Sequence, residues 1–357
     1  MTGPRHLTIG VTGLNATDNP GPGVAVLRSL RASLRPGERL VGLTYDALDP
    51  GPYTEGLADA SYLLTYPSSG PQACLLRLRQ VHEKVGLDVI VPTLDAELPL
   101  FVALGPRLRE MGIAVLLPTE TQLSLREKAG LAALGKAAGL DVPATAIVGS
   151  ADDLKRVHNQ VPYPFFVKGP FYGATRVATY EEAVAAYYRA LATWGGPVIV
   201  QAVVHGEEVN VVGVGDGDGG LWGAVAIKKL ALTDKGKGWA GVTIDDRRLL
   251  ALAEKFVSFT RWPGPFEAEV IRSGDGRYHL IEINPRFPAW VHLATGAGVN
   301  LPRAVVELAR GNRPPSPKPY AVGKMFVRIS LDQIVDMSDF ASLATTGEIA
   351  GVQPTSL

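Results

Sequence analysis

Short apolar runs alternate with segments of helical periodicity over residues 7–118. The runs are LTIGV, RLVGLTY, DVIVPT and IAVLLP. Segments such as VAVLRSLRASL and PQACLLRLRQVHEKV lie between them, and apolar side chains recur in these segments at helical spacing. The second segment predicts a helix with one broad apolar face, made of Leu75, Leu76, Leu78, Val81 and Val85. The alternation predicts an open, parallel α/β domain.

The pattern changes after Pro118. The segment TETQLSLREKAGLAALGKAAG predicts a capped helix that ends near Gly139. Beyond Pro143 a period of two dominates, around one amphipathic helix, TYEEAVAAYYRALATW. The predicted strands there are PFFVKG, PVIVQAVV, EVNVVGVG, GAVAIKKLAL, PFEAEVIR and RYHLIEIN. Turns such as GDGDGG and SGDG separate neighbouring strands and favour antiparallel pairing. A Pro-rich connection, GNRPPSPKPY, leads to a last strand, KMFVRISL.

Composition and charge narrow the class of protein. The chain has 357 residues, of which 46% are hydrophobic, so it is not disordered and about two domains are expected. Its 35 basic and 35 acidic side chains cancel, which argues against a nucleic-acid partner. No apolar run reaches the ~20 residues of a membrane span. Cys74 is the only cysteine and has no disulfide partner in the chain, so we expect a soluble protein of the reducing cytoplasm.

Several familiar sites lack support in the sequence. The first turn, GLNATDNPGPG, contains no G-x-G-x-x-G between strand and helix, so we do not predict an NAD site. The six histidines form no H-x-x-x-H pair, and no G-x-S-x-G or Cys-His arrangement indicates a hydrolase.

The most informative segment is FEAEVIRSGDGRYHLIEINPRF. Glu269 and Glu282 flank the SGDG turn and can face the same side of a hairpin, and Asn284 shares the face of Glu282. Two carboxylates and an amide oxygen form the hard ligand set that Mg²⁺ accepts. Glu267 is a spare candidate, although a solvated acidic stripe is the simpler interpretation for that residue. For Glu282, an internal salt bridge to Arg286 is the alternative to a metal site.

Lysines lie beside glycine-containing loops at separate places in the chain. Lys128 begins a helix, Lys168 ends the strand PFFVKG, and Lys228 and Lys229 lie in GAVAIKK. Beside a Mg²⁺ ligand set, such lysines suggest that a polyphosphate is neutralised. The loops GPFYGATR and TDKGKGWAG have the composition of segments that close over a ligand. In VIVQAVVHGEEVNVV, backbone groups near residues 202–204 can pair with a planar base.

Taken in order, these segments resemble the ATP-grasp superfamily, specifically its carbamoyl phosphate synthase-like and carboxylate-amine ligase-like members. The metal pattern looks like Glu269 followed by Glu282-Ile-Asn284-Pro-Arg286. The resemblance implies that Lys128 and Lys168 contact the phosphates of ATP. It assigns Glu208 to the ribose and implies nucleotide contacts for Gly173, Thr175, Gln201, Val203, Val204 and Ile281. Two departures are that Gln201 replaces a usual glutamate and that GPFYGATR is shorter than the usual lid loop.

The resemblance also implies an architecture and a reaction. We expect a pre-ATP-grasp α/β domain (1–119), a helix with a lid subdomain (120–202), an antiparallel metal-bearing subdomain (203–315) and a C-terminal extension (316–357). The expected activity joins a small-molecule carboxylate, an amino acid or peptide, to an amine through an acyl phosphate, with ATP and one or two Mg²⁺ (Mn²⁺ as a possible substitute). Arg286, Lys228 and Lys229 would assist catalysis, and Trp290 and His292 would shape the substrate pocket. Activation of bicarbonate, a non-catalytic ATP-binding role and a homodimer remain open.

Overall fold

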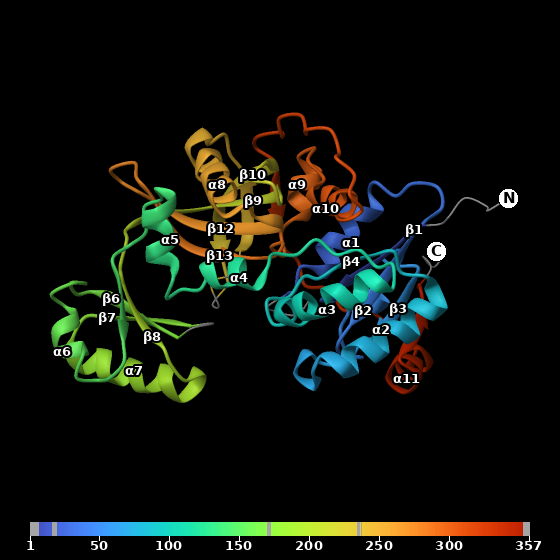
Figure 1. Cartoon of the computed structure of the whole chain (residues 1–357), viewed down its shortest axis with the longest axis horizontal. Helices are drawn as coiled ribbons and strands as arrows, with labels where there is room; N and C mark the ends of the chain where they lie inside the picture. The colour runs from blue at the N-terminus through green and yellow to red at the C-terminus, as the bar shows by residue number, and fades with distance from the viewer. Residues whose placement is uncertain (1–6, 16–19, 170–172, 234–235, 237, 353–357) are drawn as a thin grey trace.

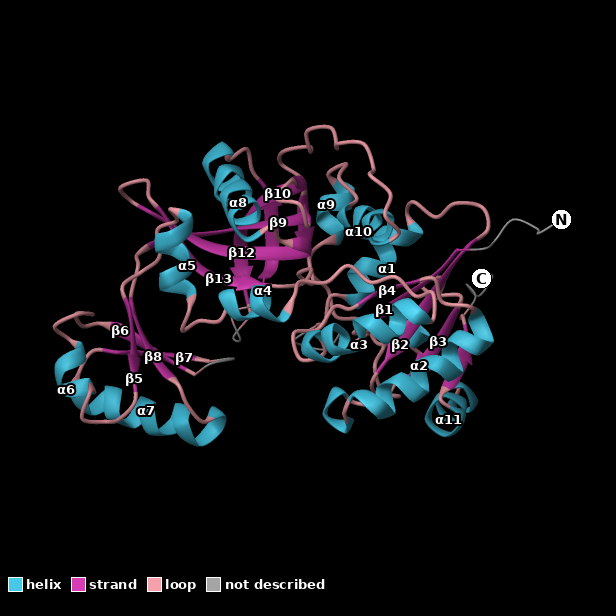
Figure 2. Cartoon of the chain, viewed as in Figure 1, coloured by secondary structure: helices cyan, strands magenta, loops and turns pink. Residues whose placement is uncertain are grey.

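The structure is a computed structural model that describes residues 7–15, 20–169, 173–233, 236 and 238–352. Three β-sheets lie along an elongated molecule: a five-stranded sheet at one end, a four-stranded sheet at the other and a six-stranded sheet between them (Figure 1). We call them the N-terminal sheet, the lid sheet and the body sheet. Helices flank each sheet (Figure 2). The predicted combination of a parallel α/β domain with antiparallel sheets is confirmed.

The N-terminal sheet has the strand order β15-β3-β2-β1-β4, in which β1 to β4 are parallel and β15 is antiparallel to β3. Its elements are β1 (Leu7–Thr12), α1 (Gly23–Arg31), β2 (Glu38–Thr44), η1 (Gly51–Tyr53), β3 (Ala60–Leu63), η2 (Pro67–Ser69), α2 (Pro71–Val85), β4 (Val89–Val91), α3 (Leu98–Glu110), α11 (Met337–Thr346) and β15 (Glu348–Ala350). Ile9 and Val11 pack with α1 on one face, whereas Leu43 and Ile90 pack with α2 and α3 on the other. Both faces are therefore covered.

Three details of the predicted N-terminal domain are wrong. The segment IAVLLP does not form a strand, and in it Ala114 makes an isolated bridge to Val89. The four-residue strand β3 was too short to stand out in the pattern. The apolar face of α2 is narrower than predicted: Cys74, Leu78 and Val81 are buried, whereas Leu76 is 61% exposed.

The lid sheet has the order β5-β8-β6-β7, and all its neighbouring strands are antiparallel. Its elements, with the two helices that lead into it, are α4 (Glu120–Leu125), α5 (Leu131–Ala138), β5 (Thr145–Val148), α6 (Leu154–Val157), β6 (Phe165–Lys168), β7 (Ala174–Val177), α7 (Tyr180–Trp194) and β8 (Val198–Ala202). Phe165 and Val167 pack with α7 on one face. Lys168 and Gln201 alternate with this apolar set and lie on the opposite face.

The helix predicted after Pro118 is two helices instead of one. Thr119 forms the capping box of α4 with Gln122, as the sequence pattern predicts, but α4 already ends at Leu125. Turns over residues 126–130 separate it from α5, which ends at the left-handed Gly139. Lys128 thus lies in the turn before α5, where the backbone changes direction between the two helices.

The body sheet has the order β13-β12-β9-β10-β11-β14 and is antiparallel throughout. Its elements are β9 (Gly206–Asp216), β10 (Leu221–Leu232), β11 (Gly238–Thr243), α8 (Arg247–Thr260), β12 (Pro263–Ser273), β13 (Tyr278–Asn284), α9 (His292–Gly296), α10 (Leu301–Ala309) and β14 (Met325–Val327). Val211 and Ala268 on one face pack with Phe256 of α8, and Val212 and Val225 on the other face join the core that contains α9 and α10. KMFVRISL supplies only the short β14 and is not the last strand.

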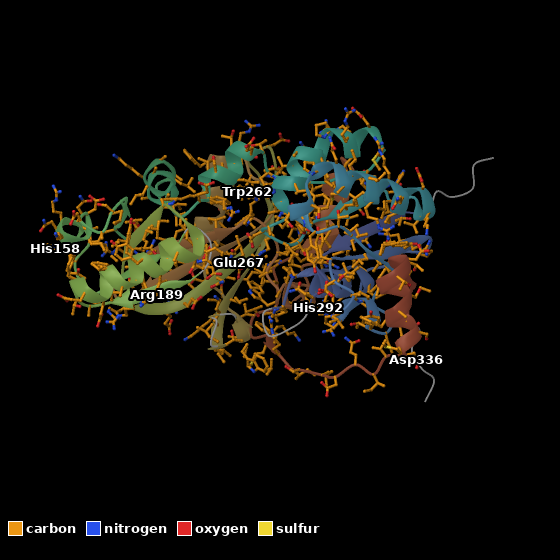
Figure 3. All side chains as sticks on the ribbon, turned by 90° about the horizontal axis from the view of Figure 1, so that it is seen from below. His158, Arg189, Trp262, Glu267, His292 and Asp336 are labelled. Atoms are coloured by element: carbon orange, nitrogen blue, oxygen red, sulfur yellow. The ribbon has the colours of Figure 1, made fainter. Side chains whose placement is uncertain are left out.

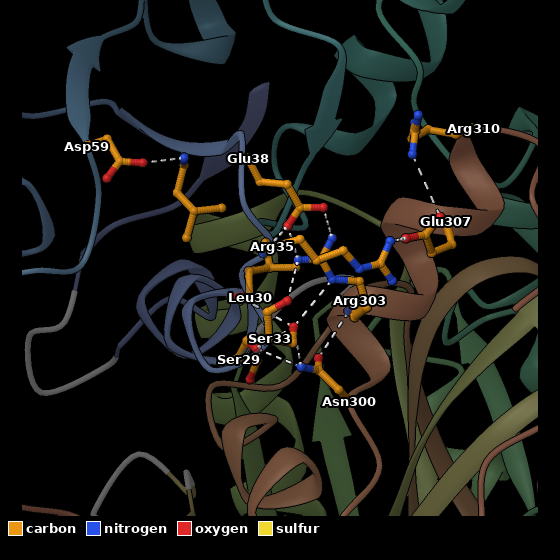
Figure 4. Close-up of polar contacts among 11 residues, drawn as sticks. Ser29, Leu30, Ser33, Arg35, Glu38, Asp59, Asn300, Arg303, Glu307 and Arg310 are labelled. Atoms are coloured by element: carbon orange, nitrogen blue, oxygen red, sulfur yellow. Dashed lines mark hydrogen bonds and ion pairs between the residues drawn. The ribbon is translucent and has the colours of Figure 1, made fainter. Parts of the chain in front are cut away.

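A network of charged and polar side chains joins the N-terminal domain to the body (Figure 4). Arg303 of α10 makes two hydrogen bonds to Glu38 of β2, at 2.8 and 2.7 Å, and both side chains are buried. Asn300 donates to the carbonyl of Ser29, at the end of α1. Arg35 pairs with Glu307 at 2.7 Å. These contacts fix the face of α1 against α10 and set the position of the N-terminal sheet beside the body sheet.

Candidate active site

The β12–β13 hairpin brings four polar side chains together on one face of the body sheet. Its register pairs Glu269 with Glu282 and Glu267 with Asn284. Directly paired residues of antiparallel strands point to the same side, so the convergence expected from the sequence is present. A one-residue bulge at Ile281 follows this group and shifts the pairing register of the rest of the hairpin by one residue. Glu267 lies near the middle of the molecule, between the lid and the N-terminal domain (Figure 3).

Glu267 is not part of a solvated stripe, and that interpretation is wrong. Its side chain is only 5% exposed. It accepts hydrogen bonds from Asn210 Nδ2 at 2.8 Å, Trp290 Nε1 at 2.9 Å and Asn284 Nδ2 at 3.1 Å. Burial, followed by the neighbouring Glu269, raises the pKa of Glu267. Its donors come from β9, β13 and the segment before α9, so no local pattern reveals this environment.

Lys229 is held among the carboxylates of this face. Its ammonium pairs with Glu208 and lies 3.5 Å from Glu269 Oε2. Burial alone would lower the pKa of Lys229, but Glu269, Glu267 and Glu208 together raise it above its ordinary value. The ammonium therefore stays charged and balances the acidic cluster. Glu208, to which the resemblance assigns the ribose, is engaged by this lysine in the structure.

Lys128 and Lys168 approach the same carboxylates from the lid side. Lys128 Nζ lies 3.5 Å from Glu282 Oε1. Lys168 Nζ donates to Gln201 Oε1 at 2.6 Å. Burial, and secondly the positive charge of Lys128, lower the pKa of Lys168 to about 8, while Glu282 and Glu269 act in the opposite direction. The two lysines are thus gathered at the junction of lid and body, where a polyanion would meet both.

Lys228 does not belong to this group. Consecutive strand residues point to opposite faces, and Lys228 lies on the face opposite Lys229. Its ammonium pairs with Glu207 at 2.6 Å, and Glu207 also binds Arg272 on that outer face. The structure does not bring Lys228 to the site predicted for it.

Arg286 faces the cluster from the segment that follows β13. Its Nε donates to Asp95 Oδ2 at 2.7 Å, its Nη2 lies 3.4 Å from Asn284 Oδ1, and its Nη1 lies 4.0 Å from Glu267 Oε2. Among the described residues, Glu282 pairs with Lys128 and not with Arg286. The proposed salt bridge between Glu282 and Arg286 is therefore not the arrangement found.

A cavity of about 220 Å³ opens beside this cluster, between the body and the N-terminal domain. The body contributes charged side chains and one aromatic ring to its wall, namely Lys229, Glu267, Glu269, Arg286, Trp290 and Arg328. The N-terminal domain contributes residues that follow β1 and β4, namely Asn15, Pro20, Gly21, Pro22, Leu94, Asp95 and Ala96. The carboxyl ends of β1 and β4 thus border the cavity, as is common for ligand sites of open parallel sheets.

The residues predicted to shape the substrate pocket differ in position. Trp290 lines the cavity, as expected. His292 does not: its Nδ1 lies 3.1 Å from Ser29 Oγ in the contact between α9 and α1, and burial lowers its pKa. Arg328 was missed by the sequence analysis, because a single arginine in KMFVRISL carries no motif. It follows β14, lines the cavity, and its Nη1 is buried with no hydrogen-bond partner among the described residues.

Comparisons with known proteins agree on the fold. A family model described as "ATP-grasp in the biosynthetic pathway with Ter operon" matches residues 196–329. The biotin carboxylase domain of the Hydrogenobacter thermophilus 2-oxoglutarate carboxylase, a complex with MgADP, ADP and bicarbonate, is similar with a TM-score of 0.68 and 18% identity over 87% of this chain and 71% of that one. The chain has the ATP-grasp fold. The resemblance seen in the sequence is thereby confirmed.

Two further solved structures are similar over most of their length. The N5-carboxyaminoimidazole synthetase of Staphylococcus aureus gives a TM-score of 0.66 at 16% identity, over 88% of this chain and 80% of that chain. The L-amino acid ligase of Bacillus licheniformis gives 0.64 at 15% identity, over 85% and 74%. No curated protein sequence matches the chain significantly.

The predicted nucleotide contacts lie on the lid and at its border with the body. Gln201 is buried on β8, and Val203 and Val204 follow that strand, half-buried. Gly173 precedes β7. Thr175 pairs with Val167 and so lies on the sheet face opposite Lys168, which places its side chain away from the lysines. The loops GPFYGATR and TDKGKGWAG, predicted to close over a ligand, fall partly outside the described residues.

Among the described residues, no group of three or more His, Cys, Asp or Glu side chains is arranged for a metal ion. The predicted set of Glu269, Glu282 and Asn284 relies on an amide as third ligand. Asn284 donates from Nδ2 to Glu269 Oε1 at 3.1 Å, so its nitrogen faces the carboxylates in this structure. In the described part of the chain, no helix is long and apolar enough to cross a membrane.

Proposed function

We propose that the protein is an ATP-dependent ligase that joins a small carboxylate, an amino acid or a peptide, to an amine through an acyl phosphate. The observation that carries this proposal is the meeting of two groups. Lys128 and Lys168 come from the lid side, and the Glu269–Glu282 pair comes from the body. The cavity with Arg286 lies directly beside them. A polyphosphate at the lysines and a carboxylate in the cavity would then be neighbours.

The donor set fits Mg²⁺ in its chemistry. Glu269 and Glu282 supply hard carboxylate oxygens on adjacent strands, and both now face lysine ammonium groups, as expected where a cation is favoured. Asn284 would join them if its amide turned over, which exchanges its nitrogen and oxygen without moving the backbone. When bound, Mg²⁺ would neutralise charge on the transferring phosphoryl group. A biotin carboxylase domain of similar fold forms a complex with MgADP and bicarbonate.

The side chains of this site can position two reactants in sequence. Lys128 and Lys168 would hold the phosphates of ATP, so that a substrate carboxylate oxygen attacks the γ-phosphorus and ADP leaves. The nitrogen of the amine then attacks the acyl carbon, phosphate departs, and the amine loses a proton. Arg286 and Lys229 lie at the cavity wall, where they would stabilise negative charge on the acyl phosphate and on the oxyanion formed by amine attack. Arg328, with its Nη1 unpaired among the described residues, would meet an anionic group of the substrate.

Bicarbonate is the second candidate acceptor of the phosphoryl group. Proteins of similar fold include a biotin carboxylase domain in complex with bicarbonate and an N5-carboxyaminoimidazole synthetase. An L-amino acid ligase is also similar in fold, with a TM-score of 0.64. Both reactions begin with attack of a carboxylate-type oxygen on ATP, so the same lysines and acids would serve either one. The two differ in the molecule that the cavity accepts.

Release of ADP from ATP and Mg²⁺ is the test, screened against pooled carboxylates and amines with mass analysis of the product. We expect release that requires both a carboxylate and an amine. Release with bicarbonate alone would favour the second candidate, and ATP binding without turnover across the panel would favour a non-catalytic role. Glu282→Ala should abolish release, and Glu207→Ala, on the outer face of the same sheet, should not. Retained turnover in Glu282→Ala contradicts the metal assignment.

Arg286→Ala separates binding from chemistry. Its guanidinium lines the cavity, whereas Lys128 and Lys168 would hold the phosphates of ATP. The variant should therefore lower kcat far more than it weakens ATP binding. A calorimetric titration with ATP and a steady-state measurement of ADP release give the two quantities. Equal losses in both would place Arg286 at the nucleotide instead.

A further inference from the structure

The turn after β4 carries a carboxylate of the N-terminal domain to the proposed active site. Asp95 Oδ2 accepts the hydrogen bond from Arg286 Nε at 2.7 Å, and Asp95 Oδ1 lies 3.8 Å from Arg126 Nη1. Arg286 belongs to the segment after β13, and Arg126 belongs to the turn that also carries Lys128. The Asp95 and Arg286 side chains are 17% and 11% exposed. Three distant parts of the chain therefore meet at one half-buried carboxylate.

The turn that presents Asp95 is built on a fully buried acid. Glu97 accepts hydrogen bonds from the backbone nitrogens of Thr93 at 2.6 Å and Leu94 at 2.8 Å. The hydroxyls of Thr12 and Tyr45 also donate to it. These bonds fix the backbone immediately before Asp95, and α3 begins immediately after Glu97. Asp95 is thus held by a rigid support and not by a flexible loop.

The bond at Nε determines the plane of the Arg286 guanidinium. With Nε engaged by Asp95, Nη1 donates to the carbonyl of Phe287 at 3.2 Å and Nη2 approaches Asn284. The buried Glu267 lies 4.0 Å from Nη1 and competes for the same cation. Without Asp95, attraction to Glu267 would turn the guanidinium toward the wall of the cavity and away from the substrate.

We propose that Asp95 is a positioning residue for Arg286, so that the N-terminal domain completes the acyl-phosphate side of the active site. This inference rests on the proposed ligase function. A misplacement of about 1 Å in a group that stabilises a transition state lowers the rate by roughly 10²-fold. Asp95→Ala should therefore lower kcat by about 10- to 100-fold. The KM for ATP should change by less than about threefold, since Lys128 and Lys168 bind the nucleotide separately.

Steady-state kinetics of four variants test the proposal: Asp95→Ala, Asp95→Asn, Arg286→Ala and the double variant Asp95→Ala/Arg286→Ala. Asparagine keeps an acceptor oxygen for Nε, so Asp95→Asn should recover most of the kcat lost in Asp95→Ala. The double variant should be no slower than Arg286→Ala, because Asp95 acts through that arginine. Multiplied losses in the double variant, or no recovery by asparagine, would overturn the proposal.

A matched control distinguishes positioning from simple attachment of the domains. Glu38→Gln weakens a second buried ion pair between the N-terminal domain and the body, far from the cavity. It should lower the melting temperature and leave kcat within about twofold of the wild type. An equal loss of kcat in Glu38→Gln and Asp95→Ala would mean that Asp95 only holds the domains together.

Failure of the proposed function would appear separately. If the wild-type chain releases no ADP with any substrate pair, the ligase proposal is wrong, and the crystal structure of Asp95→Ala then decides the role of Asp95. A guanidinium that moves toward Glu267 supports positioning by Asp95. A guanidinium that stays in place overturns it.

Discussion

Replacement of Lys168 by methionine should stabilise the folded chain while it impairs the site. Lys168 lies on the inner face of the lid sheet, bonded to Gln201, and its pKa is lowered from 10.5 to about 8, chiefly by burial. One pKa unit corresponds to about 1.4 kcal/mol, so the buried charge costs the folded state about 3 kcal/mol at pH 7. Loss of the hydrogen bond to Gln201 offsets about 1 kcal/mol of the gain. Lys168→Met should therefore be about 2 kcal/mol more stable than the wild type.

The pH dependence of this difference follows from the direction of the shift. Between pH 8 and 10.5 the folded chain binds fewer protons at Lys168 than the unfolded chain does. Wild-type stability therefore rises with pH across that window relative to the variant, which has no proton to release there. The stability advantage of Lys168→Met should be largest below pH 8 and should disappear before the pH reaches 10.5, because the lost hydrogen bond to Gln201 still counts against the variant there.

Urea unfolding followed by circular dichroism at pH 6.5, 7.5, 8.5 and 9.5 measures this difference, and calorimetry with ATP measures the cost to binding. The matched control is Lys155→Met on α6 of the same lid, where the lysine is exposed and pairs with Asp152. That variant should show no change in stability with pH relative to the wild type. The reasoning is refuted if Lys168→Met is less stable than the wild type at pH 7, or if its advantage is constant up to pH 9.5.

Three further predictions concern other parts of the structure. Arg303→Met leaves the buried Glu38 without its arginine and should lower the free energy of unfolding by about 3–5 kcal/mol in urea titrations. Arg310→Met, at the opposite end of α10 and more exposed, should change it by less than about 1 kcal/mol. Tyr45→Phe removes a hydrogen-bond donor from the buried Glu97 and should lower the free energy of unfolding by about 1–3 kcal/mol. The control is Tyr66→Phe, which removes an exposed donor to Asp46, and a Tyr45→Phe loss no greater than the control's would contradict this. Lys229→Met should lower turnover by roughly 100-fold or more and Lys228→Met by less than about threefold, because of these two lysines only Lys229 faces the cavity. Similar losses of ADP release in the two variants would contradict the assignment of the lysines to opposite faces of the sheet.

The sequence predicts the acidic hairpin well because its geometry is local. Glu269, Glu282 and Asn284 lie on two strands joined by a short turn, and the period of a strand places them on one face. Lys228 and Lys229 show the limit of that rule. Strand alternation requires adjacent lysines to point apart, but only the pairing of β10 with β9 tells which one faces the cavity.

Other parts of the site depend on contacts between distant segments. Glu267 is buried because Trp290 and Asn210 reach it from elsewhere in the chain, so its own strand gives no sign of its partners. Asp95 and Arg328 lie in irregular segments that only the packing of the N-terminal domain and β14 brings to the cavity. The helical periodicity of residues 120–138 likewise continues through residues 126–130, where the backbone turns and places Lys128 beside Glu282.

The pairing of β15 with β3 has a consequence for how the chain folds during synthesis. Residues 348–350 complete the edge of a sheet whose other strands all lie within residues 7–91. Leu343 and Ile349 also cover Tyr53 of the first domain. A nascent chain therefore exposes the edge of β3 and an uncovered apolar patch while the lid and the body are being translated. We expect the first domain to acquire its full stability only after the ribosome has passed residue 350, so that truncation before α11 should leave an aggregation-prone edge on an otherwise folded protein.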